Sequence, residues 1–162
     1  MGTIQVGGRV LLMREVVFDT ETDGLLDEVT KIHVLSARMP DGEIVSTDDY
    51  EVMEDIVTQP DTLYICHNVI RYDMPMLNKL LDLNLQFSRF ADTLALSWAL
   101  FPNRIKHGLD ELGKEHGVEK PKVDDWKGLT YDDYKHRCEE DVKINYLEWC
   151  KQKKKLEALY GN

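Results

Sequence analysis

The chain has 162 residues, of which 43% are hydrophobic and 31% are charged, and its formal net charge is −10 at pH 7. That composition indicates a water-soluble globular domain, and no apolar run approaches the roughly 20 residues that a membrane-spanning helix needs. The acidic balance excludes a protein that coats DNA nonspecifically, because such binding depends on lysine and arginine.

Short apolar runs and turn signals alternate along the chain. Asp92 is well placed as the N-cap of the helix after it, and Pro102 ends that helix. Strands come first and then alternate with helices, so we expect an α/β fold with a mixed central β-sheet flanked by α-helices. In chain order, the sequence predicts strands over residues 15–18, 31–39 and 43–46, a helix over 50–57, a strand over 63–66, a helix over 74–83, a strand near 90, helices over 93–100 and 109–115, and a final helical region from 130.

The first dozen residues allow two interpretations. Residues 3–6 and 9–12 flank Gly7-Gly8 and could form a hairpin, while Met13 could equally be an alternative start. With either interpretation, residues 1–162 have the length of a single domain, in which residues 1–13 are an N-terminal extension or hairpin.

Two carboxylates follow the first buried strand, in the motif FDTETDG. Residues two apart in a strand point to the same side, so Asp19 and Glu21 are expected to project together from its end. Two carboxylates on one side are ready ligands for hard cations such as Mg²⁺ or Mn²⁺. The structural alternative is an acidic turn that merely closes the strand.

A second acidic motif, HNVIRYD, joins the strand over residues 63–66 to the next helix. Asp73 would open that helix at the carboxyl edge of the sheet, where open α/β sheets bind their ligands. Alternatively, Asp73 simply caps the helix. Cys66 lies beside His67, but nothing in the sequence supplies the remaining machinery of a thiol nucleophile.

The third motif, HRCEED, lies in the last helical region. At about 100° per residue, Cys138, Val142 and Trp149 fall in one apolar stripe. Asp141 lies roughly 60° from the line of Cys138, at the edge of that stripe. This position permits either an inward-pointing carboxylate or an ordinary boundary residue.

Taken in order, the three motifs resemble those of the DEDD (DnaQ-like) 3′–5′ exonucleases, which have an RNase H-like fold. The likeness is strongest to the proofreading exonuclease domain of short bacteriophage DNA polymerases of the polymerase I type, and it runs from about Val16 to Trp149. The segments ADTLAL and HGLDELG resemble intervening parts of the same group. Because the fingers, palm and thumb of a polymerase have no counterpart, the resemblance implies a stand-alone nuclease or an excised domain.

This resemblance implies a metal-dependent 3′–5′ exonuclease that releases nucleoside monophosphates from single-stranded DNA ends. Thr22 and Leu25 match positions that contact the 3′-terminal nucleotide, Leu25 as an apolar wedge, and Asn68 matches a polar residue on the substrate side. From the residues alone, Leu25 could as easily belong to the core. The residues that would hold two Mg²⁺ or Mn²⁺ ions are Asp19, Glu21, Asp73 and Asp141.

The third motif departs from the phage pattern, because Arg137 stands where those polymerases usually carry a tyrosine. The DEDDh subgroup instead has a histidine one position earlier, which His136 fits as general base for the attacking water. On one continuous helix, however, His136 and Asp141 would diverge by roughly 140°. The DEDDh interpretation therefore predicts a break or turn near His136.

The sequence does not decide the sugar of the substrate, so an exoribonuclease on short RNA is an alternative, and a non-catalytic nucleic-acid-binding or polymerase-accessory module is another. The expected partners are single-stranded DNA 3′ ends and a DNA polymerase or replication protein, with no membrane. Three cysteines without a CxxC pair favour a reducing cytoplasm, that of the host if the protein is viral. The stretch Lys151 to Lys155 is either the solvated end of the last helix or a DNA-tracking patch.

Overall fold

The computed structural model describes residues 2–6, 9–121, 123 and 128–161, so the expected turn at Gly7-Gly8 lies outside the described residues. One mixed sheet, ordered β4-β3-β2-β5-β6, forms the centre of the fold, and β1 pairs with the beginning of β2. The strands are β1 (Gly2–Val6), β2 (Arg9–Thr22), β3 (Ile32–Arg38), β4 (Ile44–Thr47), β5 (Thr62–Cys66) and β6 (Phe90–Asp92). The helices are α1 (Tyr50–Val57), α2 (Asp73–Leu81), α3 (Thr93–Leu100), α4 (Leu109–His116) and α5 (Tyr131–Tyr160), with a 3₁₀ turn at Phe87–Arg89.

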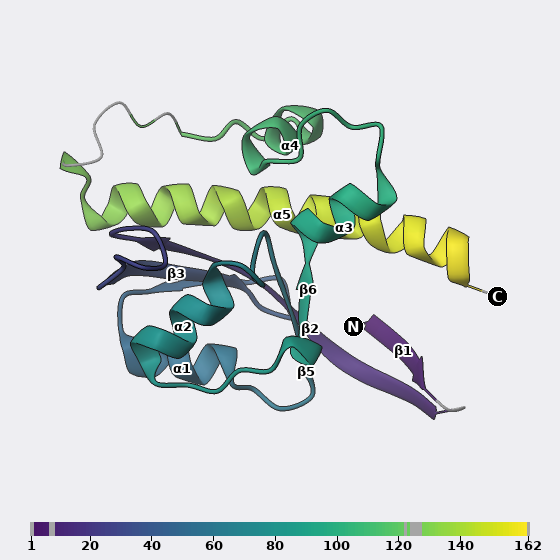
Figure 1. The fold of residues 1–162 in the computed structure, drawn as a ribbon, viewed down its shortest axis with the longest axis horizontal. Coiled ribbons are helices and arrows are strands. Elements are labelled where there is room, and N and C mark those ends of the chain that lie inside the picture. The colour runs from purple at the N-terminus through teal and green to yellow at the C-terminus, as the bar shows by residue number, and fades with distance from the viewer. Residues whose placement is uncertain (1, 7–8, 122, 124–127, 162) are drawn as a thin grey trace.

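The directions of the strands bring three carboxyl ends to one edge of the sheet. β2 runs antiparallel to β3 but parallel to β5, with Val17 opposite Ile65. β5 runs parallel to β6, with Cys66 opposite Asp92. The segments that follow β2, β5 and β6 therefore share one edge, although they lie far apart in the sequence (Figure 1). The predicted mixed sheet is confirmed.

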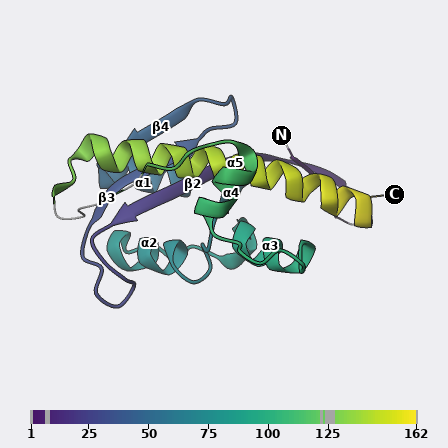
Figure 2. The same cartoon turned by 90° about the horizontal axis from the view of Figure 1, so that it is seen from above.

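Helices cover both faces of the sheet (Figures 1 and 2). α5 crosses one face, with α3 and α4 packed against it, and α1 and α2 cover the other face. Side chains along β2 point alternately to the two faces of the sheet. Val16 and Phe18 join the core under α1 and α2. Val17 packs on the α5 side with Val142 and Trp149. Asp19 continues the alternation of Val17 and so faces α5.

Side-chain caps set where α3 and α5 begin. The Asp92 carboxylate accepts hydrogen bonds from the backbone N–H groups of Leu94 and Ala95, as the sequence predicts for the start of α3. Thr130 and Asp133 form a reciprocal capping box at the start of α5. Each cap satisfies backbone donors that a helix start otherwise leaves without partners. No helix in the described part of the chain is both long and apolar enough to cross a membrane.

Candidate active site

Four carboxylates from three elements converge at the carboxyl edge of the sheet. Asp19 and Glu21 lie at the end of β2, Asp73 is the first residue of α2, and Asp141 lies in α5. Oxygen atoms of Asp19, Glu21 and Asp141 all lie within 4.8 Å of one another. Asp19 also belongs to a second group, with Asp73 and the sulfur atom of Cys66, whose ligand atoms likewise lie within 4.8 Å of one another. Asp19 is therefore the shared member of two candidate metal groups.

The local sequence explains these placements. Asp19 and Glu21 are two residues apart on β2, and the register with β3 shifts directly after Glu21, where β2 leaves the sheet. In α5, Asp141 is buried, as are Cys138 and Val142 on either side of it along the helix. The edge of the apolar stripe therefore faces β2. Of the two interpretations of Asp141, the structure supports the inward-pointing carboxylate.

Neighbouring polar groups connect the elements that bear the carboxylates. The Thr20 hydroxyl donates to Asp73 Oδ1 over 2.6 Å and so ties α2 to the end of β2. The Cys138 thiol donates to the backbone carbonyl oxygen of Asp19 over 3.2 Å and so ties α5 to β2. Because these contacts join separate elements, the geometry of the cluster depends on the packed fold.

Two cationic side chains that were not predicted as site residues contact the cluster. Lys120, in the α4–α5 connection, places Nζ 2.9 Å from Asp141 Oδ2 and 3.1 Å from Asp110 Oδ1. Arg137 of α5 places Nε 2.9 Å from Glu21 Oε1. Arg137 is about one helical turn before Asp141, so helical spacing could have revealed it. Lys120 has no such signal in the sequence, because a loop delivers it.

Burial raises the pKa values of all four carboxyl groups, and repulsion by other members of the cluster adds to the shift of Asp19 and Glu21. The pKa of Asp19 lies well above its usual value because the group is buried and the other three carboxylates repel its charge. Burial raises the pKa of Glu21 to about 7, although Arg137 opposes the shift, and raises that of Asp73 to about 6. Burial also raises the pKa of Asp141. A cation among these groups would relieve the repulsion.

The cluster fits a divalent metal ion. Its donors are carboxylate oxygens, which hard cations such as Mg²⁺ prefer. Asp141 Oδ1 is buried and has no hydrogen-bond partner among the described residues, so this oxygen is left for a cation. The other oxygen of Asp141 contacts the Lys120 ammonium group, as expected at a position that attracts positive charge.

The prediction of a bend near His136 is wrong. α5 runs without interruption from Tyr131 to Tyr160, so His136 and Asp141 lie on one continuous helix. His136 is exposed, whereas Asp141 is buried. The capping box at Thr130 starts the helix before His136 and leaves no turn in which the chain could change direction. Within α5, Arg137 rather than His136 contacts a carboxylate of the cluster.

Leu25 projects from the loop after β2 and is 76% exposed, so it is not a core residue. A hollow of about 450 Å³ beside it is lined by Thr22, His33 and Tyr134, among others. The rings of His33 and Tyr134 stack with their centroids 4.1 Å apart. Tyr134 lies about two helical turns before Asp141 and so shares its side of α5, a signal that the sequence reasoning missed. An exposed apolar side chain thus borders a hollow with aromatic walls.

Asn68, the third predicted substrate contact, lies in the loop between β5 and α2. It takes a left-handed φ of 65°. Its backbone N–H donates to Asp92 Oδ1 over 2.9 Å, and that of Ile70 donates to Asp92 Oδ2 over 3.2 Å. Because Asp92 also caps α3, one buried carboxylate fixes the loop that leads into Asp73.

Cys66 and His67 do not have the properties of a nucleophile and its base. Burial raises the pKa of the Cys66 thiol well above its usual value, so the thiol stays protonated. Burial lowers the pKa of His67 to about 4, so its ring is neutral at pH 7. The His67 Nδ1 atom lies 2.9 Å from Thr93 Oγ1, which in turn donates to Asn145 Oδ1 over 2.6 Å. Since Thr93 has one proton to donate, Nδ1 of His67 must donate to it.

Comparison with known proteins identifies the family. The family model described as the RNase_H superfamily matches residues 16–158. The chain belongs to the RNase H superfamily. The matched segment holds all four carboxylates, and the RNase H-like fold expected from the sequence is confirmed.

One relative and two solved structures show the range of similar proteins. The DNA polymerase III PolC-type of Staphylococcus saprophyticus is 28% identical over 179 aligned positions, which cover 89% of this chain and only 12% of that polymerase. Brucella melitensis NrnC, solved with bound Mg²⁺, is similar with a TM-score of 0.72 and 19% identity over 94% of this chain and 78% of NrnC. E. coli Exonuclease I in complex with a dT13 oligonucleotide has a TM-score of 0.66 and 15% identity, over 92% of this chain and 43% of the exonuclease.

These matches confirm the predicted kinship with the DEDD exonucleases. The two solved structures support the fold alone at these levels of identity. The closer likeness to phage polymerases stays a prediction.

Proposed function

We propose that the protein is a metal-dependent 3′–5′ exonuclease that hydrolyses single-stranded DNA ends to nucleoside monophosphates. The observation that carries the proposal is the convergence of Asp19, Glu21 and Asp141 within 4.8 Å, with Asp73 in the adjoining group. Phosphodiester hydrolysis requires in-line attack by water and stabilisation of the leaving oxygen, for which such a carboxylate cluster is suited. E. coli Exonuclease I, which has a similar fold, was solved with a dT13 oligonucleotide, and this supports a DNA substrate.

Asp19, Glu21, Asp73 and Asp141 would hold two Mg²⁺ or Mn²⁺ ions. When bound, such a pair stabilises both the attacking and the leaving oxygen of the displacement. Because Asp19 belongs to both candidate metal groups, its carboxylate would help to hold either ion. The Thr20 hydroxyl orients Asp73 through its 2.6 Å hydrogen bond, as partners of metal-binding carboxylates commonly do.

Thr22, Leu25 and Asn68 are proposed to position the 3′-terminal nucleotide. Leu25 is exposed and can press against the terminal base, and the hollow beside it has the His33 and Tyr134 rings in its wall. Because this site would bind the nucleotide at the 3′ end of the strand, cleavage would proceed in the 3′–5′ direction. Each cleavage leaves a new 3′-hydroxyl on the shortened strand, which can enter the same site.

General-base chemistry of the DEDDh type is not part of this proposal. It requires His136 to turn toward the carboxylates, and the continuous helix α5 holds this side chain at the exposed surface. We assign Arg137 instead as a positioning residue, because its Nε atom contacts Glu21 Oε1 at 2.9 Å. Glu21 is thereby held at the end of β2, facing Asp19 and Asp141.

Action on short RNA is the second candidate function. Brucella melitensis NrnC was also solved bound to pGG, with a TM-score of 0.71 to this chain, and this favours very short oligonucleotides as substrates. Discrimination of ribose from deoxyribose depends on the shape of the pocket around the 2′-position. The carboxylate cluster serves either sugar, so only the substrate panel described next separates the two.

The proposal is tested with 12-nucleotide oligo-dT and oligo-U, each labelled at its 3′ or 5′ end, in Mg²⁺ or in EDTA. We expect the 3′ label to appear at once as a mononucleotide, while the 5′-labelled strand shortens one nucleotide at a time. Activity should disappear in EDTA and in Asp19→Asn. Internal cuts, early release of the 5′ label, or full activity in EDTA would contradict the proposal. A strong preference for oligo-U would identify RNA, rather than DNA, as the substrate.

We further propose that the nuclease works with a DNA polymerase or replication protein. The PolC-type relative is a polymerase, and the matched region is a small part of it. The cysteines Cys66, Cys138 and Cys150 are free thiols, which suits a reducing cytoplasm, that of the host if the protein is viral. Co-purification of a tagged protein with a polymerase would support the partnership.

A further inference from the structure

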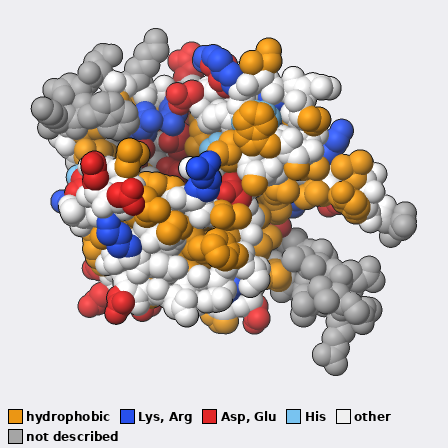
Figure 3. All heavy atoms as spheres, in the orientation of Figure 1, with side chains coloured by type: hydrophobic (Ala, Val, Ile, Leu, Met, Phe, Trp, Pro, Cys, Tyr) orange, Lys and Arg blue, Asp and Glu red, His pale blue; other side chains and the backbone are white. Residues whose placement is uncertain are grey.

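Two adjoining hollows follow the C-terminal half of α5. One, of about 1140 Å³, lies between the α3–α4 connection and α5 and includes Phe101, Lys151, Lys155 and Leu159 in its walls. The other, of about 510 Å³, shares Phe101, Lys151 and Lys155 and adds Lys154. We call the combined surface the α5 groove. In Figure 3, hydrophobic side chains gather at the right of the molecule, where Figure 1 shows this half of α5.

The α5 groove is positively charged in an otherwise acidic protein. The whole chain has a formal net charge of −10, yet the groove has six cationic and two acidic side chains in its walls. Lys154 and Lys155 are exposed and form no ion pair with a described residue. A local excess of lysine suits a polyanion. The charged lining residues are Arg104, Lys106, Lys114, Lys151, Lys154 and Lys155, with Glu111 and Glu115.

The groove also offers apolar surface between its cations. Arg104 and Lys151 both lie over the Phe101 ring, 4.6 and 5.1 Å from its centroid. Ile105 is 91% exposed and Leu159 is 56% exposed. Lysines that contact a phosphate backbone, with apolar surface between them against which bases can pack, suit the binding of single-stranded nucleic acid.

A third hollow connects the α5 groove to the carboxylates. It has a volume of about 630 Å³ and is lined by His67, Lys106, Glu111 and Lys120, among others. Lys106 and Glu111 also line the α5 groove. At the other end, Lys120 Nζ lies 2.9 Å from Asp141 Oδ2. The third hollow therefore lies between the candidate metal site and the α5 groove and shares two wall residues with the groove.

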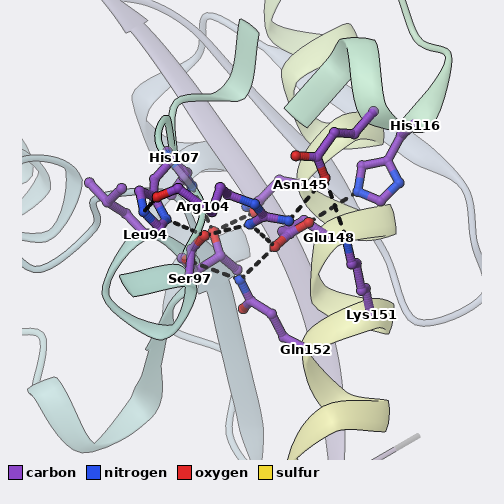
Figure 4. A network of polar contacts seen from close by, with 12 residues as sticks. Leu94, Ser97, Arg104, His107, His116, Asn145, Glu148, Lys151 and Gln152 are labelled. Atoms are coloured by element: carbon purple, nitrogen blue, oxygen red, sulfur yellow. Dashed lines mark hydrogen bonds and ion pairs between the residues drawn. The ribbon is translucent and has the colours of Figure 1, made fainter. Parts of the chain in front are cut away.

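A buried polar network holds the walls of the α5 groove in place (Figure 4). The fully buried Glu148 carboxylate accepts a 2.8 Å hydrogen bond from Arg104 and lies 3.1 Å from His116 Nε2. Arg104 also donates to the Ser97 hydroxyl over 2.6 Å. The α3–α4 connection, α4 and α5 are thus linked through one carboxylate, and the groove is formed before any ligand binds.

We propose that the single strand upstream of the 3′-terminal nucleotide lies along the α5 groove, with its phosphates against Lys154 and Lys155 and its bases over the exposed apolar side chains of Ile105 and Leu159. The proposal rests on the proposed function for the position of the 3′ end. Along α5, Lys155 is about 21 Å from Asp141 at ~1.5 Å per residue. At ~3.4 Å per phosphate, a stacked strand needs about six nucleotides to reach it. A dinucleotide therefore stays at the carboxylates, whereas a 12-mer also contacts the groove.

The experiment compares two double charge reversals in the full chain. Lys154→Glu/Lys155→Glu alters the groove, and Lys135→Glu/Lys143→Glu is the matched control, with the same charge change on α5 outside the groove. Initial rates are measured in Mg²⁺ on a dinucleotide and on 12-nucleotide oligo-dT and oligo-U. For the groove variant we expect about a tenfold rise in KM on the 12-mers with kcat retained, and unchanged dinucleotide kinetics. Both sugars should respond, because the phosphates are common to them.

Binding is measured separately in EDTA, by fluorescence anisotropy with labelled oligo-dT of 12 nucleotides, so that the result does not depend on hydrolysis. The slope of log affinity against log salt should fall by about 1.4 in the groove variant, from ~0.7 for each lost contact. Equal effects of the two charge reversals, no effect of either, or equal losses on dinucleotide and 12-mer would overturn the proposal. A wild-type protein that binds oligo-dT through the groove but hydrolyses nothing would instead contradict the proposed function alone.

Discussion

Replacing Glu21 with glutamine is expected to stabilise the metal-free protein at pH 8 and to change its stability little near pH 4. Burial raises the pKa of Glu21 from 4.5 to about 7, and its side chain is only 13% exposed. A folded-state pKa above the unfolded value stabilises the fold below pH 4.5, and this stabilisation is lost as the pH rises through 7. At ~1.36 kcal/mol per pKa unit, the loss is about 3 kcal/mol, and glutamine, which does not ionise, avoids it.

The assay is urea denaturation of both proteins in EDTA between pH 4 and pH 8. The difference between their free energies of unfolding isolates Glu21, because other titrating groups are common to both. His67 is one such group, since its pKa is lowered to about 4 and its contribution to stability rises with pH up to about 6.5. We expect the difference to grow by about 3 kcal/mol between pH 4.5 and pH 7.5. A constant or shrinking difference would refute the reasoning.

Three other substitutions test separate parts of the site and fold. His136→Ala should change kcat for mononucleotide release by less than about threefold, because the side chain is exposed; a loss of two orders of magnitude would restore it as the base. Leu25→Ser should raise KM on single strands with kcat retained, because a substrate contact is removed; a fall in kcat alone would contradict this. Thr130→Ala should lower the free energy of unfolding by about 1 kcal/mol in urea, and Thr130→Ser should not.

Local signals in the sequence predicted much of the fold. α3 occupies residues 93–100 as expected, because Asp92 caps its start and a proline follows its end. The common orientation of Asp19 and Glu21 follows from the alternation of a strand, and the burial of Asp141 follows from the helical stripe. Each of these properties is set by residues within a few positions of the group concerned.

The predictions that failed, and the residues that were not predicted, depend on contacts between segments that lie far apart in the sequence. The bend near His136 was inferred from the spacing of a family motif, yet residues 131–160 contain neither glycine nor proline to interrupt a helix. Lys120 was missed because the α4–α5 connection brings it to Asp141, and loop paths leave no periodic signal. The sequence allowed a DNA-tracking patch at Lys151 to Lys155 but could not place it in a groove, since Arg104, Lys106 and Lys155 become neighbours only after α3, α4 and α5 pack together.

The central claim is that the carboxylates around Asp19 form a divalent metal site. Calorimetric titration of Mn²⁺ into the metal-free protein at pH 7.5 tests it most directly. We predict saturable binding of about two ions per chain, weakened at least tenfold in Asp19→Asn and unchanged in Asp27→Asn, a matched change at an exposed aspartate outside the cluster. Absence of saturable binding, or equal binding by wild type and Asp19→Asn, would contradict the claim.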